Sequence, residues 1–198
     1  MKKQTYKHIQ QQGPSDCGVA CLKMVLQHFN SDASFERLRE LSGTNMTGTT
    51  FLGLQQAGQH LGLDTEGFEA DIESLRNCKD ICILHVVLES QMLHYVVYYG
   101  YDTETQQYLI GDPSQAQIQY LTEEQVEKTW QSKSLLLIKP TDKLVPLSTQ
   151  LKNQRLWFWT FVKEDMNLLV VAAILGVFIA ILGLSTAIFS FCRSETIT

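Results

Sequence analysis

The chain has 198 residues and a formal net charge of −5 at pH 7, from 16 Lys and Arg against 21 Asp and Glu. This acidic balance, with no stripe of basic residues, argues against a nucleic-acid-binding protein. An odd number of cysteines, five, and an N-terminus without the apolar core of a secretion signal indicate a reducing, cytosolic setting for residues 1–150. The length allows one core domain and an additional segment.

The first predicted helix begins at a cysteine, within the stretch QQGPSDCGVACLKMVLQHF at 11–29. Asp16, or Ser15 before it, is the expected N-cap, and apolar residues then recur every three or four positions. Cys17 is therefore expected in the first turn, where unpaired backbone N–H groups and the helix dipole lower a thiol pKa. By itself the pattern also fits a small cysteine that only packs in the core.

Two more helices are expected before residue 62. Ser34 is the expected cap of a helix at 35–41, and Thr50 caps another that Gly62 ends. The intervening loop, GTNMTGTT at 43–50, has the glycine spacing of a phosphate-binding loop. It lacks the lysine and follows a helix, so no nucleotide site is predicted there.

Strands dominate the next part of the chain. They are expected at 80–88, 92–101, 107–111 and 135–138, with a helix from the capping box that starts at Thr122 to Trp130. Helices followed by strands of this kind predict an α+β fold, in which a helical part packs against an antiparallel sheet.

Three residues form a candidate cysteine-hydrolase centre: Cys17 at its helix start, His94 in a strand and Asp112 at the end of the neighbouring strand. Strands that pair lie about 4.8 Å apart, so His94 and Asp112 can reach each other. His94 would take the thiol proton and Asp112 would fix the imidazole tautomer. The amide of Gln11, with the backbone N–H of Cys17, can supply two donors to an oxyanion.

The surrounding motifs resemble the C39 peptidase domain over roughly residues 4–140. The motifs are Gln11-x5-Cys17, Leu93-His94-Tyr95-Val96-Val97 and Gly111-Asp112-Pro113. The resemblance implies a papain-like fold at the N-terminus of bacterial ABC exporters that process bacteriocins. It also implies cleavage of leader peptides after a double glycine, with Cys17 as nucleophile, His94 as base, Asp112 as orienting acid and Gln11 as oxyanion donor.

The predicted peptidase domain at 1–140 is followed by a linker at 141–150 and an interfacial, elbow-like helix at 151–165. No charge occurs between Asp165 and Arg193, which predicts a transmembrane helix at 166–192 and a short tail at 193–198. The excess of Lys and Arg before the span predicts a single-pass protein of the bacterial plasma membrane, with the N-terminal domain in the cytoplasm.

Exporters of this family continue with further helices and a nucleotide-binding domain, so the resemblance implies a truncated or frame-shifted exporter. No cofactor is expected in this chain, because ATP would bind only to that missing domain. The expected partners are a double-glycine leader peptide, the membrane, and exporter subunits or a second copy of the chain, without nucleic acid.

Two alternatives stay open. Cys17-x3-Cys21 and Cys78-x3-Cys82-x2-His85 offer thiols and an imidazole to a zinc ion, at spacings that depart from common zinc pairs. A membrane-anchored module that binds leader peptides without cutting them is the other, because a fold alone does not establish activity.

Overall fold

The computed structural model describes residues 6–88, 92–150, 156–157, 159, 163 and 166–195, without the side chains of 167–169 and 185–195. The chain divides into two units, Met1–Leu147 and Ser148–Thr198. The predicted interfacial helix at 151–165 lies almost wholly outside the described residues.

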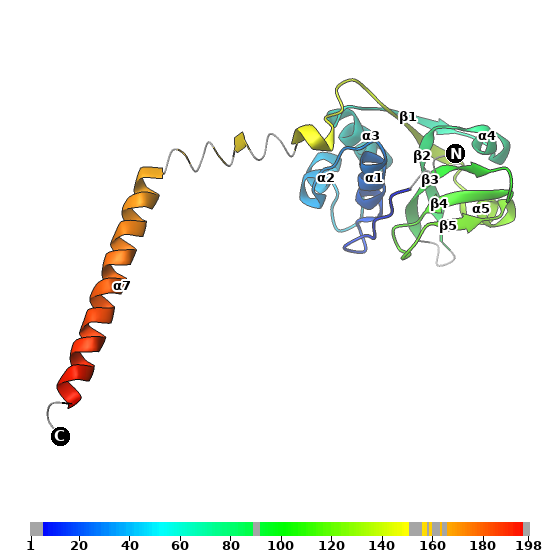
Figure 1. Ribbon diagram of the computed structural model, residues 1–198. Helices are drawn as coiled ribbons and strands as arrows, with labels where there is room; N and C mark the ends of the chain where they lie inside the picture. Colours follow the sequence, from blue (N-terminus) through cyan, green and yellow to red (C-terminus); the bar gives the residue numbers. More distant parts are fainter. Residues whose placement is uncertain are drawn as a thin grey trace. The chain divides into compact units, whose positions relative to one another are not determined.

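Three helices open the first unit: α1 (Cys17–His28), α2 (Phe35–Ser42) and α3 (Phe51–His60) (Figure 1). The predicted caps are confirmed, since the side chains of Ser34 and Thr50 accept hydrogen bonds from the first turns of α2 and α3. Gly43 and Gly62, with φ of 62° and 88°, follow α2 and α3 in the left-handed conformation that favours glycine.

A single six-stranded antiparallel sheet follows, with the strand order β1-β6-β2-β3-β4-β5. The strands are β1 (Leu63–Glu69), β2 (Ile81–Val87), β3 (Leu93–Asp102), β4 (Gln107–Gly111), β5 (Gln119–Leu121) and β6 (Ser134–Pro140). The predicted α+β fold and its four strands are confirmed. The two strands at the edges of the sheet, β1 and β5, were not predicted.

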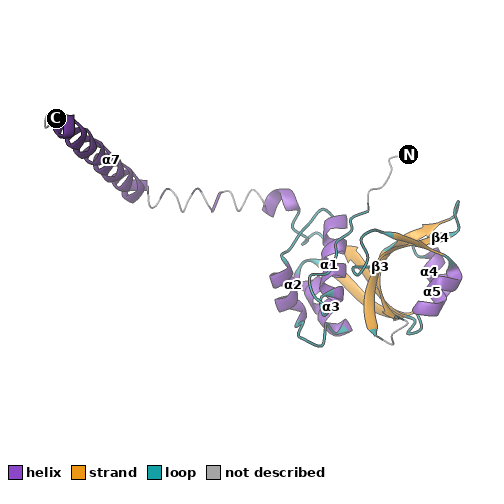
Figure 2. Cartoon of the chain, turned by 90° about the horizontal axis from the view of Figure 1, so that it is seen from below, coloured by secondary structure: helices purple, strands orange, loops and turns teal. Residues whose placement is uncertain are grey.

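Helices cover both faces of the sheet, so the domain has two hydrophobic cores. Figure 2 shows α1, α2 and α3 on one side of the strands, and α4 (Ile72–Asn77) and α5 (Glu123–Thr129) on the other. Successive side chains of β3 point to opposite faces of the sheet and so contribute to both cores. Tyr95 and Val97 pack toward α1, while Val96 and Tyr98 pack toward α4 and α5. The predicted capping box of α5 is confirmed, whereas α4 was not predicted.

The segment predicted as a linker is bonded to the domain over its first part. Thr141 bonds the carbonyl of Gly62 through both its N–H, at 3.1 Å, and its hydroxyl, at 2.6 Å. Farther along, the Leu147 N–H donates to the carbonyl of Asn30 at 2.9 Å, and Leu144 packs against the α1 core. Residues 141–147 therefore belong to the packed domain.

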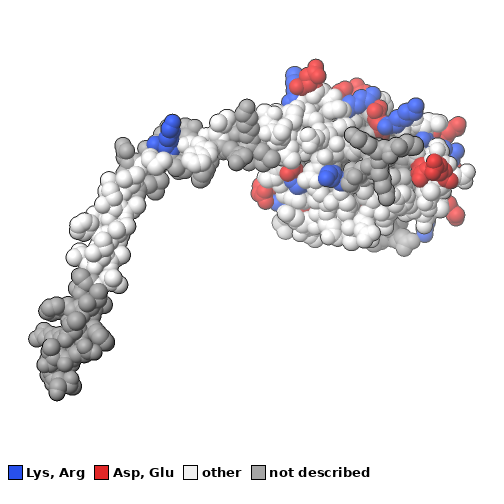
Figure 3. Space-filling model, in the orientation of Figure 1, with Lys and Arg blue, Asp and Glu red and all other residues white. Residues whose placement is uncertain are grey.

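The second unit contains α7 (Met166–Glu195), which coincides with the predicted transmembrane segment. Its described side chains from 170 to 184 are exposed and without charge, and they are white in Figure 3. Within the described residues, no helix combines the length and the hydropathy that a membrane crossing requires. On the visible face of the first unit, Lys and Arg are interspersed with Asp and Glu.

Replacement of Leu22 by Ala tests the α1 core. The Leu22 side chain is fully buried, so its loss leaves a cavity and should lower the free energy of unfolding by about 2–5 kcal/mol. Leu52→Ala is the matched control, because Leu52 is also helical but 60% exposed, and it should cost less than about 1 kcal/mol. Urea unfolding of the full chain measures both, and equal losses would contradict the assignment of this core.

Candidate active site

Cys17 is the first residue of α1 and is 7% exposed. Asp16 stands at the predicted N-cap position, and its carbonyl accepts from the Ala20 N–H at 2.8 Å. The expectation that its side chain caps the helix is wrong, because the carboxylate makes no cap bond and instead pairs with Arg39. The first-turn N–H groups next to the thiol are therefore not occupied by a capping carboxylate.

His94 and Asp112 meet as the hairpin geometry predicts. His94 lies near the start of β3, Asp112 follows β4, and His94 Nε2 lies 2.8 Å from Asp112 Oδ1. Both residues are buried. The same carboxylate oxygen accepts from the backbone N–H and the hydroxyl of Ser114, each at 2.8 Å, which fixes its orientation. With Nε2 engaged by Asp112, Nδ1 is the ring atom left for Cys17.

Burial and pairing act in opposite directions on the charges of this group. Burial raises the Cys17 pKa, but hydrogen bonding and charge attraction from His94 outweigh it, and the thiol pKa falls below its usual value. Burial lowers the His94 pKa, yet hydrogen bonds with Asp112 and Cys17 raise it to about 9. Burial likewise opposes the Asp112 carboxylate, whose pKa is lowered by its bonds to His94 and Ser114. The arrangement favours a thiolate beside an imidazolium.

Gln11 is tied to the same site through its backbone, since its N–H donates to the carbonyl of Pro113 at 2.9 Å. This bond joins the segment before α1 to the residue that follows Asp112. The side-chain oxygen Oε1 of Gln11 is buried and has no hydrogen-bond partner within the described part of the chain. The role of Gln11 as an oxyanion donor therefore stays a prediction.

A cleft of about 920 Å³ opens at Cys17. The loop residues 46–50 and Phe51 of α3 line one part of it, residues 67–69 of β1 another, and Leu93 and Tyr95 of β3 a third. Large apolar side chains stand exposed in it, with Met46 99% and Leu93 63% exposed. The sequence did not indicate the contribution of β1, because β1 itself was not predicted.

Gly18 of α1 lies in close contact with residues that line this cleft. A Cβ added there would lie 3.2 Å from atoms of Leu54, Thr49 and Tyr95, closer than ordinary contact. A larger residue at 18 would require these neighbours to shift, so glycine lets the loop at 43–50 approach α1 closely.

The other described cysteines bear on the zinc alternative. Cys21 is fully buried in the α1 core, and its thiol donates to the Tyr95 carbonyl at 3.2 Å. Cys78 and Cys82 lie with their sulfur atoms 3.6 Å apart, while His85 lines the cleft and its ring packs at a tilt against that of Tyr95. Among the described residues, no three or more His, Cys, Asp and Glu side chains gather as metal ligands.

Residues 5–143 match the model of the Peptidase C39 family. The chain is 32% identical over 173 residues to the lactococcin-G-processing and transport ATP-binding protein LagD of Lactococcus lactis, which covers 86% of this chain and 24% of that protein. It is 34% identical over 136 residues to the pediocin PA-1 transport/processing ATP-binding protein PedD of Pediococcus acidilactici, covering 67% and 18%. The chain thus spans about a quarter or less of the length of these relatives.

The chain also resembles solved structures of peptidase domains from transporters. The peptidase domain of Streptococcus ComA, a bi-functional ABC transporter involved in quorum sensing, aligns with a TM-score of 0.63 and 33% identity, over 69% of this chain and all of that one. A double glycine motif protease from an AMS/PCAT transporter, solved in complex with the leader peptide, aligns with a TM-score of 0.61 and 25% identity, over 71% and 97%.

The pairing of Cys17 with His94 is testable by alkylation. The thiolate form reacts with iodoacetamide, so the rate should rise with pH through the lowered Cys17 pKa and exceed that of an ordinary thiol at pH 7. His94→Ala removes the attraction that offsets burial, so the midpoint should move to higher pH. Modification at pH 7 should slow about tenfold for each unit of that shift. Mass spectrometry of the Cys17 peptide measures the rate.

This measurement needs a Cys78→Ser background, because hydrogen bonding with Cys82 lowers the Cys78 pKa to about 6 and makes that thiol reactive too. His85→Ala is the matched control, since it removes another imidazole that lines the same cleft and should leave the Cys17 midpoint in place. An unchanged pH dependence in His94→Ala would contradict the pairing.

Proposed function

Because the chain belongs to the Peptidase C39 family, we propose that it is a cysteine peptidase that cleaves leader peptides after a double glycine, with Cys17, His94 and Asp112 as its catalytic residues. The observation that carries the proposal is the buried 2.8 Å contact between His94 and Asp112 beside a first-turn cysteine at the mouth of a cleft.

In this mechanism the Cys17 thiolate attacks the carbonyl carbon of the second glycine and forms a tetrahedral intermediate. The His94 imidazolium gives its proton to the leaving amine, which releases the C-terminal product and leaves an acyl-enzyme. The neutral imidazole then removes a proton from water, the hydroxide attacks the thioester carbonyl, and the leader leaves with a free carboxylate. Asp112 stays ionised and holds the imidazole through Nε2.

The tetrahedral intermediates carry an oxyanion that needs donors. We assign this role to the backbone N–H of Cys17 and the side-chain NH₂ of Gln11. The tie between Gln11 and Pro113 supports this assignment, because it fixes the Gln11 backbone next to the end of β4. Donors that are held in place before the reaction stabilise developing charge without reorganisation.

The substrate class follows from the relatives. LagD and PedD are named as processing and transport proteins, and the AMS/PCAT structure holds a double glycine motif protease with its leader peptide. In this chain the exposed apolar residues of the cleft, such as Met46, Phe68 and Leu93, offer contacts to apolar side chains of a leader. Attachment to a bacterial plasma membrane through 166–192, a cytoplasmic domain and partnership with exporter subunits stay predictions from the sequence.

Cleavage of a synthetic leader peptide ending in Gly-Gly, extended by a few residues, tests the proposed function. The full chain should release the C-terminal fragment, and Cys17→Ala should abolish release because it removes the nucleophile. Cys78→Ser, which removes a partly exposed thiol away from the cleft, should cut like the unaltered chain. Peptide binding without cleavage by the unaltered chain would favour the non-cleaving module, and equal cutting by Cys17→Ala would remove Cys17 from the mechanism.

The orienting role of Asp112 predicts a shift in the pH profile. The reactive state requires His94 to be protonated, so kcat/KM should fall above about pH 9. Asp112→Asn removes the carboxylate that raises the His94 pKa, so this limb should move to lower pH. The rate should drop by about 10²–10⁴-fold while the fold stays intact. Asp64→Asn, on the exposed side of β1, is the control. Unfolding of Asp112→Asn, or an unmoved limb, would make Asp112 structural.

Gln11→Ala should lower kcat by roughly 10²-fold or more, because one oxyanion donor is lost, with little change in KM. Gln10→Ala, an exposed neighbour, should leave the rate unchanged. If the two variants behave alike, Gln11 does not donate to the oxyanion.

A further inference from the structure

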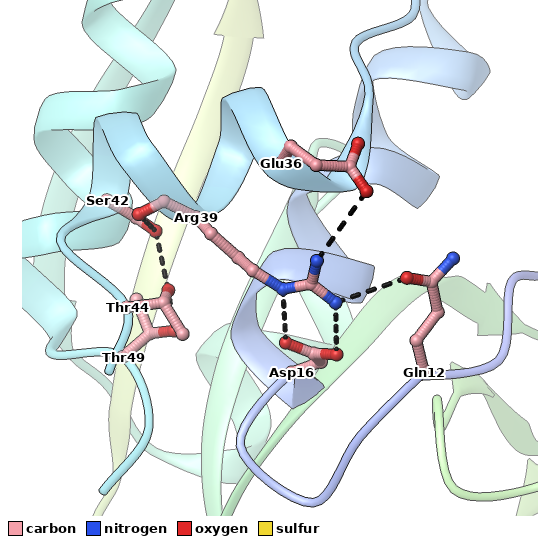
Figure 4. A network of polar contacts seen from close by, with 7 residues as sticks. All are labelled: Gln12, Asp16, Glu36, Arg39, Ser42, Thr44 and Thr49. Atoms are coloured by element: carbon pink, nitrogen blue, oxygen red, sulfur yellow. Dashed lines mark hydrogen bonds and ion pairs between the residues drawn. The ribbon is translucent and has the colours of Figure 1, made fainter. Parts of the chain in front are cut away.

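The residue before the proposed nucleophile carries a buried negative charge. Asp16 is 4% exposed, and its two carboxylate oxygens are held by the guanidinium of Arg39 (Figure 4). Nε of Arg39 lies 2.9 Å from Oδ1, and Nη2 lies 2.7 Å from Oδ2. This is the two-pronged geometry that arginine forms with carboxylates, and it fixes orientation as well as charge.

Arg39 also holds the chain that leads into α1. Its Nη2 donates to Gln12 Oε1 at 3.1 Å, one residue from the proposed oxyanion donor. The guanidinium lies 5.5 Å from the centre of the Phe35 ring, and Glu36 stands 3.8 Å from Nη1. One side chain of α2 therefore connects residues 12 and 16, on either side of the turn before Cys17.

The C-terminal residue of α2 is bonded to the loop that lines the cleft. Ser42 Oγ lies 2.7 Å from Thr44 Oγ1, which in turn lies 2.6 Å from Thr49 Oγ1 (Figure 4). Thr49 lines the cleft and is one of the side chains against which Gly18 packs. The helix α2 is thus bonded both to the start of α1 and to the loop that faces it.

The position of Asp16 creates an electrostatic problem for a thiolate at Cys17. Asp16 and Cys17 are neighbours in the chain, so an uncompensated carboxylate at 16 would repel a negative sulfur and raise the Cys17 pKa. Burial would raise the Asp16 pKa as well, but the hydrogen bond from Arg39 outweighs it and keeps the carboxylate ionised. Arg39 is the cation that pairs with this carboxylate.

We propose that Arg39 and Asp16 form a positioning pair for Cys17, in which the guanidinium holds the first turn of α1 in place and offsets the carboxylate charge beside the thiolate. The inference rests on the proposed function for its catalytic consequence, and neither residue touches the substrate. His94 is the titratable group seen to lower the Cys17 pKa, and Asp112 acts on His94 in turn, while the charge of Cys17 is felt by Tyr95 and Cys21. Glu36 faces Arg39 from its own helix.

A charge-deletion cycle tests the pair in the full chain with Cys78→Ser. The variants are Arg39→Met, Asp16→Asn and the double variant, and the first readout is the pH dependence of Cys17 alkylation by iodoacetamide. Arg39→Met leaves the Asp16 charge uncompensated, so the midpoint should rise, and alkylation below the midpoint should slow about tenfold for each unit of the rise. The double variant removes both charges, so its midpoint should return most of the way although the hydrogen bonds are gone.

The second readout is kcat/KM for the Gly-Gly peptide. Arg39→Lys keeps the positive charge but loses the two-pronged grip, so the alkylation midpoint should stay near its original value while kcat/KM falls several-fold. Arg37→Met is the matched control, since Arg37 is on the same helix and forms a surface pair with Glu40 at 2.7 Å, and it should change neither readout.

The inference is overturned if Arg39→Met leaves the midpoint unchanged, or if the double variant is shifted as far as the single one. Should Arg39→Met fail to fold, Asp16→Asn decides: its midpoint should stay or fall, and a rise would refute the electrostatic role. Alkylation needs no peptide, so a shifted midpoint in a chain that cuts no peptide would refute the proposed function and leave the pair intact.

Discussion

The site depends on the hydrogen bond between His94 and Asp112, which allows charged side chains to be buried beside Cys17. Cys17, His94 and Asp112 are all under a tenth exposed, and burial opposes ionisation of each one. Because each charge is offset by its neighbour, the three groups favour one another's ionised forms against the effect of burial. Asp112 is held in turn by Ser114, and Gln11 by Pro113, so the residues after β4 fix the orientation of the whole group.

The two-sided packing of the sheet explains how these residues stay in register. β3 is packed from one side by α1 and from the other by α4 and α5, so its position relative to α1 is determined by two independent cores. Both cores therefore hold the strand that carries His94. The helix α2 adds a third restraint, since it is bonded both to the segment before α1 and to the loop at 43–50.

What the sequence predicted well was local. The caps Ser34, Thr50 and Thr122 act through bonds three residues away, so their signals are complete within a short window. The strands with dense apolar residues were also found. β1 was missed because its sequence, LDTEGFE, is mostly polar and exposed on an edge, and α4 because six residues are too few for a periodic pattern. The partner of Asp16 is 23 residues away, so only the fold could show that this carboxylate pairs with Arg39 rather than capping its helix.

The hydrogen bonds of residues 141–147 have a practical consequence for the design of shorter fragments. Thr141 bonds Gly62, and Leu147 bonds Asn30, the residue two positions beyond the end of α1. A fragment that ends at residue 140, where β6 ends, would lose these hydrogen bonds and expose the apolar surface that Leu144 covers. Its yield and its thermal stability would then be lowered by the loss of residues 141–147 rather than by any change in the cleft. A minimal fragment that keeps the whole domain therefore extends through Leu147.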